Sequence, residues 1–194
     1  NECAEHQDGT IVHVACNGKY AGHIVISDEI KDDAEQTISG LKKLGVSKTV
    51  MLTGDNQRSA EIVASKLSLD KVYAQLLSED KLRIVEELHN ELAQNNKKTG
   101  KKGTLIFAGD GINDAPVLAR ADAGIAMGTM GSDAAVESAD IIIMEDKPSK
   151  IVEGIKISRR TLKIVYENLI GSLGIKGLII ILSALGISNM WLAV

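Results

Sequence analysis

The sequence is poor in aromatic residues, in cysteine and in net charge. Only 3% of its 194 residues are aromatic, so its apolar content comes from alanine, valine, isoleucine and leucine, which favours a parallel sheet covered by helices. Its 2 cysteines are too few for a disulfide framework and are typical of a reducing compartment. The net charge of −4 argues against a nucleic-acid partner, because proteins that bind nucleic acid carry basic surfaces.

The length of the chain is enough for one ordinary domain plus further segments. The sequence starts at Asn1 rather than at methionine, and it stops inside the apolar run 190–194. We therefore expect it to be a fragment of a longer protein.

The first 27 residues have the alternating pattern of strands. Two such runs, 10–16 and 20–27, are separated by Asn17-Gly18, which predicts a β-hairpin. A zinc site is the alternative interpretation, because cysteines and histidines here follow the spacings Cys-x-x-His and His-x-x-Cys. We favour the plain hairpin, because a strand points His13 and Cys16 to opposite faces. The four residues concerned are Cys3, His6, His13 and Cys16.

After a polar segment at 28–33, strand patterns alternate with helix patterns. Apolar runs predict the strands, and apolar residues at helical spacing predict the helices between them. This order indicates βαβ units and a mostly parallel sheet. A further short helix is expected after Ser132. The predicted strands are 49–52, 72–74, 104–108, 123–127 and 140–144, and the predicted apolar helix faces lie within 34–44, 60–67 and 82–92.

The third predicted helix has an unusual lysine near its start. Ser78 is the expected N-cap, followed by Glu79 and Asp80 in the first turn, as the helix dipole prefers. Lys81 then stands where a capping box would carry glutamate, and a cation there opposes the dipole by up to about 1 kcal/mol. It is either an exposed lysine at a tolerated cost or a lysine aimed at a phosphate or an aspartate. The lysine-rich stretch 95–103 is predicted to be a solvated loop.

The stretch from Gly109 to Pro116 carries two carboxylates. It follows the predicted strand 104–108 and leads into a short helix with proline in its first turn, so Asp110 and Asp114 lie between a strand and a helix. In open α/β sheets, ligands bind at that edge. Two carboxylates held together repel each other unless a cation intervenes, and Mg²⁺, which prefers oxygen ligands, is the expected cation. The alternative interpretation is that Asp-Gly marks only a turn.

From Ser149 onward the sequence becomes basic and amphipathic, and then almost entirely apolar. The segment Leu169–Ile187 is about long enough to span a bilayer, and the lysines and arginines before it place that end in the cytoplasm. A buried core helix is the alternative interpretation. Lys176 interrupts the apolar segment. It is either functional or reaches the membrane surface through its long side chain.

Three motifs follow one another on successive βα units: Thr53-Gly54-Asp55 after a strand, Lys81 at a helix start, and Gly109-Asp110-Gly111-Ile112-Asn113-Asp114. This order resembles the second, third and fourth motifs of the haloacid dehalogenase-like superfamily. The resemblance implies an α/β fold with a Rossmann-type parallel sheet and helices on both faces. The strings 51–56 and 109–116 resemble the P-type ATPases in particular. The segment 168–177 is similar to the penultimate membrane helix of the heavy-metal pumps, and its lysine to that of the zinc, cadmium and lead exporters.

The resemblance implies a role for each residue of these motifs. Asp110 would ligate Mg²⁺, and Asp114 would complete the acidic pair at the same metal. Asn113 and Thr53 would bond the oxygens of an aspartyl-phosphate. Lys81 would neutralise the charge of the phosphate and of the nucleophile. The residues implied to bind the cofactors, ATP and Mg²⁺, are Thr53, Gly54, Asp55, Gly109 and Gly111.

The resemblance also implies a domain order and a location. Asp28 and Lys31 would belong to a hinge, and Lys176 would be a counter-charge near the transported ion. Residues 1–168 would be cytoplasmic, in an integral protein of the plasma or inner membrane. Its partners would be a divalent zinc, cadmium or lead ion, membrane lipid and the remaining domains of the parent chain. The implied parts are the end of a nucleotide-binding domain (1–27), a phosphorylation domain (28–148), a stalk helix (149–168), a transmembrane helix (169–187) and the start of the last transmembrane helix (188–194).

Several motifs of the P-type ATPases are absent from the sequence: the Asp-Lys-Thr-Gly-Thr nucleophile motif, the Cys-Pro-Cys metal site and the Thr-Gly-Glu loop. The fragment alone is therefore expected to be inactive, and metal export to belong to the parent chain. Two other functions stay open. A stand-alone, membrane-anchored phosphatase of the same fold would need Asp28 as its nucleophile. A metal-binding module would use the cluster of Cys3, His6, His13 and Cys16.

Overall fold

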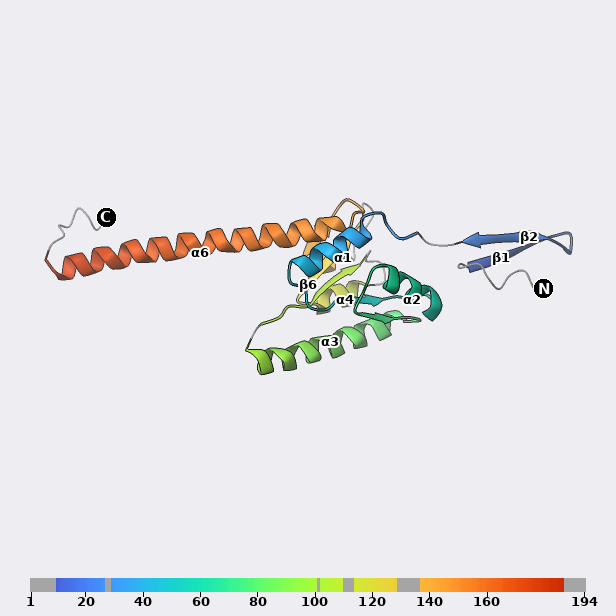
Figure 1. The fold of residues 1–194 in the computed structure, drawn as a ribbon, viewed down its shortest axis with the longest axis horizontal. Coiled ribbons are helices and arrows are strands. Elements are labelled where there is room, and N and C mark those ends of the chain that lie inside the picture. Colours follow the sequence, from blue (N-terminus) through green and yellow to red (C-terminus); the bar gives the residue numbers. More distant parts are fainter. Residues whose placement is uncertain (1–9, 27–28, 101, 110–113, 129–136, 187–194) are drawn as a thin grey trace. The chain divides into compact units, whose positions relative to one another are not determined.

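A computed structural model of the protein describes residues 10–26, 29–100, 102–109, 114–128 and 137–186 (Figure 1). The chain divides into two compact units, Asn1–Ile151 and Val152–Val194. The first unit contains an antiparallel hairpin and an α/β part, and the second contains most of one long helix.

The hairpin consists of β1 (Thr10–Cys16) and β2 (Lys19–Ile26), which pair antiparallel. Asn17 and Gly18 connect them with φ angles of 52° and 75°, the left-handed backbone that a tight two-residue hairpin turn requires. The predicted hairpin is therefore confirmed.

The alternative zinc site is only partly covered by the structure, because Cys3 and His6 lie outside the described residues. His13 lies opposite His23 in the register, and Cys16 lies opposite Lys19. Within the described parts of the chain, no three or more metal-binding side chains come together. The hairpin therefore offers no described metal centre.

The α/β part alternates helices and strands. β3 and β4 pair in parallel, and β5, β6 and β7 form a second parallel group in that order. The alternation confirms the predicted α/β class, and each predicted strand has its counterpart. The short helix expected after Ser132 falls mostly on residues outside the described ones. In order, the elements are α1 (Ala34–Lys43), β3 (Val50–Leu52), α2 (Gln57–Lys66), β4 (Lys71–Tyr73), α3 (Ser78–Thr99), β5 (Ile106–Gly109), α4 (Ala115–Arg120), β6 (Ala123–Met127) and β7 (Ile141–Ile143).

An aspartate joins each pair of neighbouring parallel strands at their amino ends. Its carboxylate accepts the backbone N–H of a residue at the start of the adjacent strand, and its own N–H donates to the carbonyl of that same residue. We call this two-way pairing an aspartate clamp. The three clamps are Asp70 with Thr49, Asp122 with Leu105, and Asp140 with Gly124, with N···Oδ distances of 2.7, 2.8 and 2.9 Å.

The helix α4 packs closely on β6. Val117 and Leu118 on α4 are fully buried, and Ile125 and Ala126 on β6 are nearly so. A Cβ added at Gly124 would lie 2.5 Å from the carbonyl oxygen of Leu118, so only glycine fits at this position. This close packing holds α4 against β6, and Asp114, a predicted site residue, is the N-cap residue of α4.

The start of α3 differs from the prediction. The helix begins at Ser78 itself, and Leu77 occupies the N-cap position. The carboxylate of Asp80 accepts the N–H of Leu77 at 3.2 Å. The predicted N-cap at Ser78 is therefore wrong, because the acidic residue that bonds back to the cap is Asp80 and not the residue at position 81. Lys81 is left outside the capping interaction.

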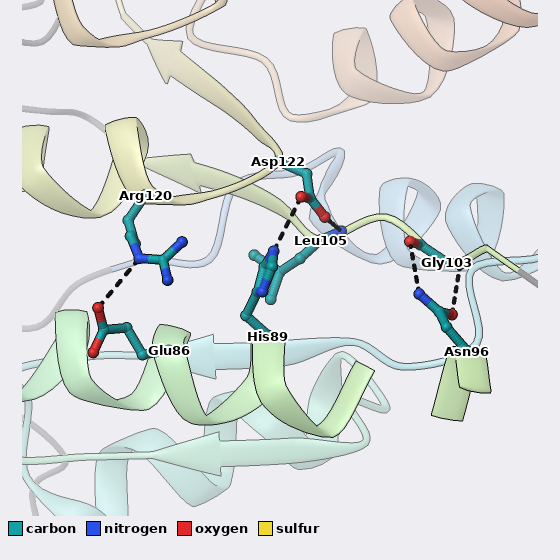
Figure 2. Close-up of polar contacts among 7 residues, drawn as sticks. All are labelled: Glu86, His89, Asn96, Gly103, Leu105, Arg120 and Asp122. Carbon is teal, nitrogen blue, oxygen red and sulfur yellow. Dashed lines mark hydrogen bonds and ion pairs between the residues drawn. The ribbon is translucent and has the colours of Figure 1, made fainter. Parts of the chain in front are cut away.

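The end of α3 also differs from the prediction. The helix continues to Thr99, so the predicted loop 95–103 is wrong for its first part. Lys97 and Lys98 lie in the last turn, where the helix dipole favours cations, and Gly100 ends the helix with a φ of 67°. Asn96 binds the backbone of Gly103, accepting its N–H at 2.7 Å and donating to its carbonyl at 3.5 Å (Figure 2).

The long helix α6 runs from Ser149 to Ala184 without interruption (Figure 1). Its 36 residues correspond to about 54 Å at 1.5 Å per residue. It is long and apolar enough to cross a membrane. Many of its large apolar side chains are exposed. The expectation of one helix from the basic into the apolar stretch is confirmed through Ala184, and 187–194 lie outside the described residues.

Candidate functional site

A lysine and an aspartate from different helix starts meet in a largely buried ion pair. Lys81 Nζ donates to Asp114 Oδ1 at 2.8 Å, and their side chains are 18% and 9% exposed. Lys81 lies in the first turn of α3, after β4, and Asp114 is the N-cap residue of α4, after β5. A cation alone in a first turn is unfavourable, so the buried carboxylate gives Lys81 the partner that its position requires.

The carboxylate of Asp114 is not used to cap its own helix. The first N–H groups of α4 that it could serve instead bond its backbone carbonyl, from Val117 at 2.9 Å and from Leu118 at 2.8 Å. The side chain therefore faces Lys81, where it is an acceptor for a cation rather than a structural cap. Together with the close packing of α4 on β6, this arrangement holds the carboxylate at the end of β5.

Gly109, the last residue of β5, lies directly against this carboxylate. A Cβ added there would come within 3.1 Å of Asp114 Oδ2 and within 3.1 Å of Phe107 Cε1. These approaches are tighter than ordinary contacts, so a side chain at this position would displace the Asp114 carboxylate. The structure thus brings together three of the predicted site residues: Lys81, Gly109 and Asp114.

A second polar cluster lies at the end of β3. Thr53 Oγ1 donates to Asp55 Oδ2 at 2.6 Å, and the N–H of Asp55 donates back to Thr53 Oγ1 at 3.1 Å. The N–H groups of Gln75 and Leu76, in the loop after β4, donate to the carbonyls of Asp55 and Thr53 at 2.8 and 3.1 Å. A Cβ at Gly54 would meet the carbonyl oxygen of Leu76 at 3.4 Å. The loops after β3 and β4 are therefore bound to each other through their backbones.

The two clusters are not joined by direct contacts. Among the described residues, no hydrogen bond or ion pair links Thr53 or Asp55 to Lys81 or Asp114. Lys176 is exposed on α6, in the second unit. Of the predicted hinge residues, Lys31 forms an ion pair with Asp146. Four predicted site residues, Asp28, Asp110, Gly111 and Asn113, lie outside the described residues.

Sequence reasoning missed a set of polar contacts that α3 makes with other elements (Figure 2). His89 Nε2 lies 3.1 Å from Asp122 Oδ1, and Arg120 Nε donates to Glu86 Oε1 at 3.2 Å. With the Asn96–Gly103 contact, these interactions connect α3 to the segment before β5, to the end of α4 and to the residue before β6. They are made by the same helix whose first turn carries Lys81. Their sequence signal is weak, because each joins residues on different elements.

Asp122 is the centre of this set. Its carboxylate accepts the N–H of Leu105 at 2.8 Å and also contacts His89. The Leu105 N–H, reinforced by His89, holds the pKa of the Asp122 carboxyl below its usual value. A cavity of about 310 Å³ lies beside it, between α3 and the segment before β5. An aspartate directly before an apolar strand was the available signal for this residue.

Comparison with known proteins gives one family match and several similar transport ATPases. The model of the haloacid dehalogenase-like hydrolases matches residues 1–122. The chain is 54% identical over 186 residues to the cadmium, zinc and cobalt-transporting ATPase of Bacillus subtilis (strain 168), covering 96% of this chain and 26% of that protein. It is 50% identical over 186 residues to the zinc-transporting ATPase of Synechocystis, covering 96% and 25%. The chain therefore spans about a quarter of the length of these curated relatives.

Solved structures give the same picture. A zinc-transporting PIB-type ATPase in its E2.Pi state matches with a TM-score of 0.78 and 37% identity, over 94% of this chain and 28% of that one. The catalytic domain of the CPx-ATPase CopB-B matches with a TM-score of 0.57 and 31% identity, over 74% and 52%. The described α/β part is therefore folded as in the catalytic parts of metal-transporting ATPases.

Proposed function

The chain belongs to the haloacid dehalogenase-like hydrolase family, and we propose that it is part of an ATP-driven P-type pump that exports a divalent heavy metal, zinc, cadmium or lead, from the cytoplasm. The relatives in Bacillus subtilis and Synechocystis are both named for zinc transport, and the first also for cadmium and cobalt. Because the chain corresponds to about a quarter of their length, the pumping activity is that of a longer parent protein.

The buried Lys81–Asp114 pair carries the proposal. Phosphoryl transfer depends on positioning and on neutralising the charge of the transferred group. An ammonium held at 2.8 Å from a carboxylate, at the edge where β5 ends, is preorganised before any phosphate arrives, and such charges are worth most where water is excluded. We infer that Lys81 neutralises the phosphoryl oxygens and the nucleophile, and that Asp114 keeps its ammonium in place.

The other motif residues complete this site in the proposal. The hydroxyl of Thr53, which donates to Asp55, would instead donate to a phosphate oxygen, and Asn113 would bond another. Gly54, Asp55, Gly109 and Gly111 would line the bound ATP and phosphate. The aspartate that becomes phosphorylated would come from elsewhere in the parent chain, since the sequence holds no Asp-Lys-Thr-Gly-Thr motif.

Haloacid dehalogenase-like P-type ATPases use ATP and Mg²⁺ in general, and the described residues are compatible with that ion. Asp114 is buried, its Oδ2 faces the Cβ-free Gly109, and a carboxylate oxygen is the ligand type that Mg²⁺ takes. Asp110 and Asp114 would hold the ion together. When bound, it would supply positive charge to the phosphoryl oxygens.

The membrane part of the proposal rests on α6. Residues 1–168 would be cytoplasmic, with a stalk at 149–168 and a membrane span at 169–187 in the plasma or inner membrane, in contact with lipid. The preceding parts would be the end of a nucleotide-binding domain (1–27) and a phosphorylation domain (28–148), with the start of a last span at 188–194. The exposed Lys176 on α6 would be a counter-charge near the transported ion, because an ionisable residue within a span is costly and usually marks a functional site.

The test is phosphoenzyme turnover of the full-length pump in membrane vesicles, with labelled ATP and zinc. We expect Lys81→Ala to lower turnover about 10²–10³-fold, the usual effect of removing one preorganised charge. Lys66→Ala is the matched control, because Lys66 is an exposed lysine in the last turn of α2, and it should leave turnover unchanged. Asp110→Asn should abolish turnover. Normal turnover in the Lys81 or Asp110 variant would overturn the assigned roles, and the absence of a zinc-dependent phosphoenzyme in the unmodified protein would overturn the function.

A further inference from the structure

Asp33 stands at the start of one helix but caps another. It occupies the N-cap position of α1, yet its side chain makes no capping bond to that helix. Its Oδ2 instead accepts the N–H of Ser149, the first residue of α6, at 2.8 Å. A carboxylate is favourable at a helix N-terminus because it pairs with an unsatisfied N–H and with the helix dipole. The helix that this carboxylate stabilises is therefore α6, which begins 116 residues further along the chain.

The N-terminus of α1 is hydrogen-bonded without that carboxylate. The carbonyl oxygen of Asp33 accepts both the N–H of Thr37 at 2.9 Å and its hydroxyl at 2.7 Å. The N–H of Ala34 donates to the carbonyl of Lys31 at 2.9 Å. Because backbone bonds serve α1, the side chain of Asp33 is free to bind α6.

A second contact joins the same two segments. Lys31 pairs with Asp146, three residues before α6. Residues 29–33 together with Asp146, Lys147 and Ser149 line a cavity of about 440 Å³. The hydrogen bonds from the hydroxyl and the N–H of Ser149 hold the pKa of the Asp33 carboxyl below its usual value, so Asp33 is ionised at neutral pH. The segment 29–33 is thus bonded both to Asp146, just before α6, and to Ser149, the first residue of α6.

We propose that Asp33 is a positioning residue that couples the segment 29–33 to α6, so that a rotation of this segment moves the first turn of α6. The inference rests on the proposed pump function, in which 28–31 is the hinge of the nucleotide-binding domain and α6 enters the membrane. Because α6 continues without a break from Ser149 to Ala184, a constraint on its first N–H is also a constraint on the helix that carries the candidate span. The coupling would link nucleotide-domain motion to metal transport, without taking part in phosphoryl transfer.

Three substitutions separate the geometry of the carboxylate from its charge. Asp33→Ala removes the acceptor, Asp33→Asn keeps an acceptor oxygen at the same reach without the charge, and Asp33→Glu keeps the charge but moves it by one methylene. Asp32→Ala is the matched control, because Asp32 is an exposed acidic neighbour. All four are made in the full-length pump.

The first readout is amide hydrogen exchange in the first turn of α6. We expect exchange about fivefold faster in Asp33→Ala, the usual consequence of losing an N-cap, and near-normal exchange in Asp33→Asn and Asp32→Ala. Unchanged exchange in Asp33→Ala would show that the contact does not hold the helix and would overturn the proposal. This readout does not depend on pumping, so it stands even if the proposed function fails.

The second readout is the amount of zinc moved into vesicles per ATP hydrolysed. We expect Asp33→Ala and Asp33→Glu to lower this ratio about fivefold or more, the scale of coupling between sites, with phosphoenzyme still formed. Asp33→Asn should retain the ratio. If Asp33→Ala does not accumulate in the membrane, the contrast between the Asn and Glu variants decides. An equal ratio in all variants, or an equal loss in Asp32→Ala, would overturn the coupling, whereas loss of phosphoenzyme in the unmodified protein would instead overturn the proposed function.

Discussion

The two ends of the parallel strands use aspartate in different ways. At the amino ends, Asp70, Asp122 and Asp140 each close a two-way pairing with the backbone of the neighbouring strand. At the carboxyl ends, Asp55 faces the hydroxyl of Thr53 and Asp114 faces the ammonium of Lys81. An aspartate that immediately precedes a strand is satisfied by the fold itself. One that follows a strand is bonded to groups that can also bind a ligand, so its position relative to the strand indicates its role.

The largest expected contrast is in catalysis. Asp114→Asn in the full-length pump should lower phosphoenzyme turnover about 10²–10³-fold, because it removes the charge that holds Lys81. Asp122→Asn should leave turnover within about threefold, since its carboxylate lies at the opposite end of the strands and is partly exposed. The measurement is the zinc-dependent rate in vesicles. Equal losses in the two variants would remove the distinction between the two ends.

The next contrast concerns two glycines. Gly124→Ala should lower the free energy of unfolding by roughly 1–3 kcal/mol, the usual cost of overpacking, because its Cβ would meet the rigid backbone of Leu118 at 2.5 Å. Gly109→Ala should lower the free energy of unfolding less than Gly124→Ala does, but it should lower turnover more. Its Cβ would meet the side chains of Asp114 and Phe107 at 3.1 Å, and side chains can move where backbone cannot. Urea unfolding and turnover are measured on both variants. A larger loss of stability in Gly109→Ala together with a larger loss of turnover in Gly124→Ala would contradict the distinction between the two ends of the strands.

The smallest expected contrast is in pH dependence. The hydroxyl and the N–H of Thr49 lower the pKa of Asp70 from 3.8, and the Leu105 N–H lowers that of Asp122. A folded state with lowered carboxyl pKa values binds fewer protons than the unfolded state. The clamps of Asp70 and Asp122 therefore stabilise the fold fully above the ordinary carboxyl pKa, and their contribution is lost as the pH falls through the lowered pKa. Asp70→Asn should flatten the fall of the urea midpoint below about pH 4, and an unchanged slope would show that this clamp does not contribute.

Much of the carboxyl-end site could be predicted from the sequence, because its residues lie in short motifs. The strand before Gly109 and the proline at Pro116 identify a strand-to-helix junction. Lys81 is unusual in the sequence because a cation in a first turn is unfavourable, and the structure supplies its partner, Asp114. The sequence does not predict the pairing itself, since the two residues are 33 positions apart and no local pattern connects them.

The amino-end clamps and the limits of α3 were not predicted, for a physical reason. Whether Ser78 or Leu77 caps the helix depends on which N–H the carboxylate of Asp80 reaches, and neighbouring registers differ by a small energy. The polar end of α3 has the sequence pattern of a loop, because its side chains form no apolar stripe. Its last turn is stabilised by contacts such as Asn96 with Gly103, which depend on the folded chain and leave no periodic signal.

The clamps also have a consequence for the order in which the chain folds. They join residues separated by only 21, 17 and 16 positions. Closing a loop of this length is fast and costs little more entropy than closing a shorter one. Each βαβ unit can therefore find its strand register from local contacts, before distant parts of the chain are in place. Strands as short as three residues offer few ladder bonds, so we expect the clamps to suppress register errors while the protein emerges from the ribosome.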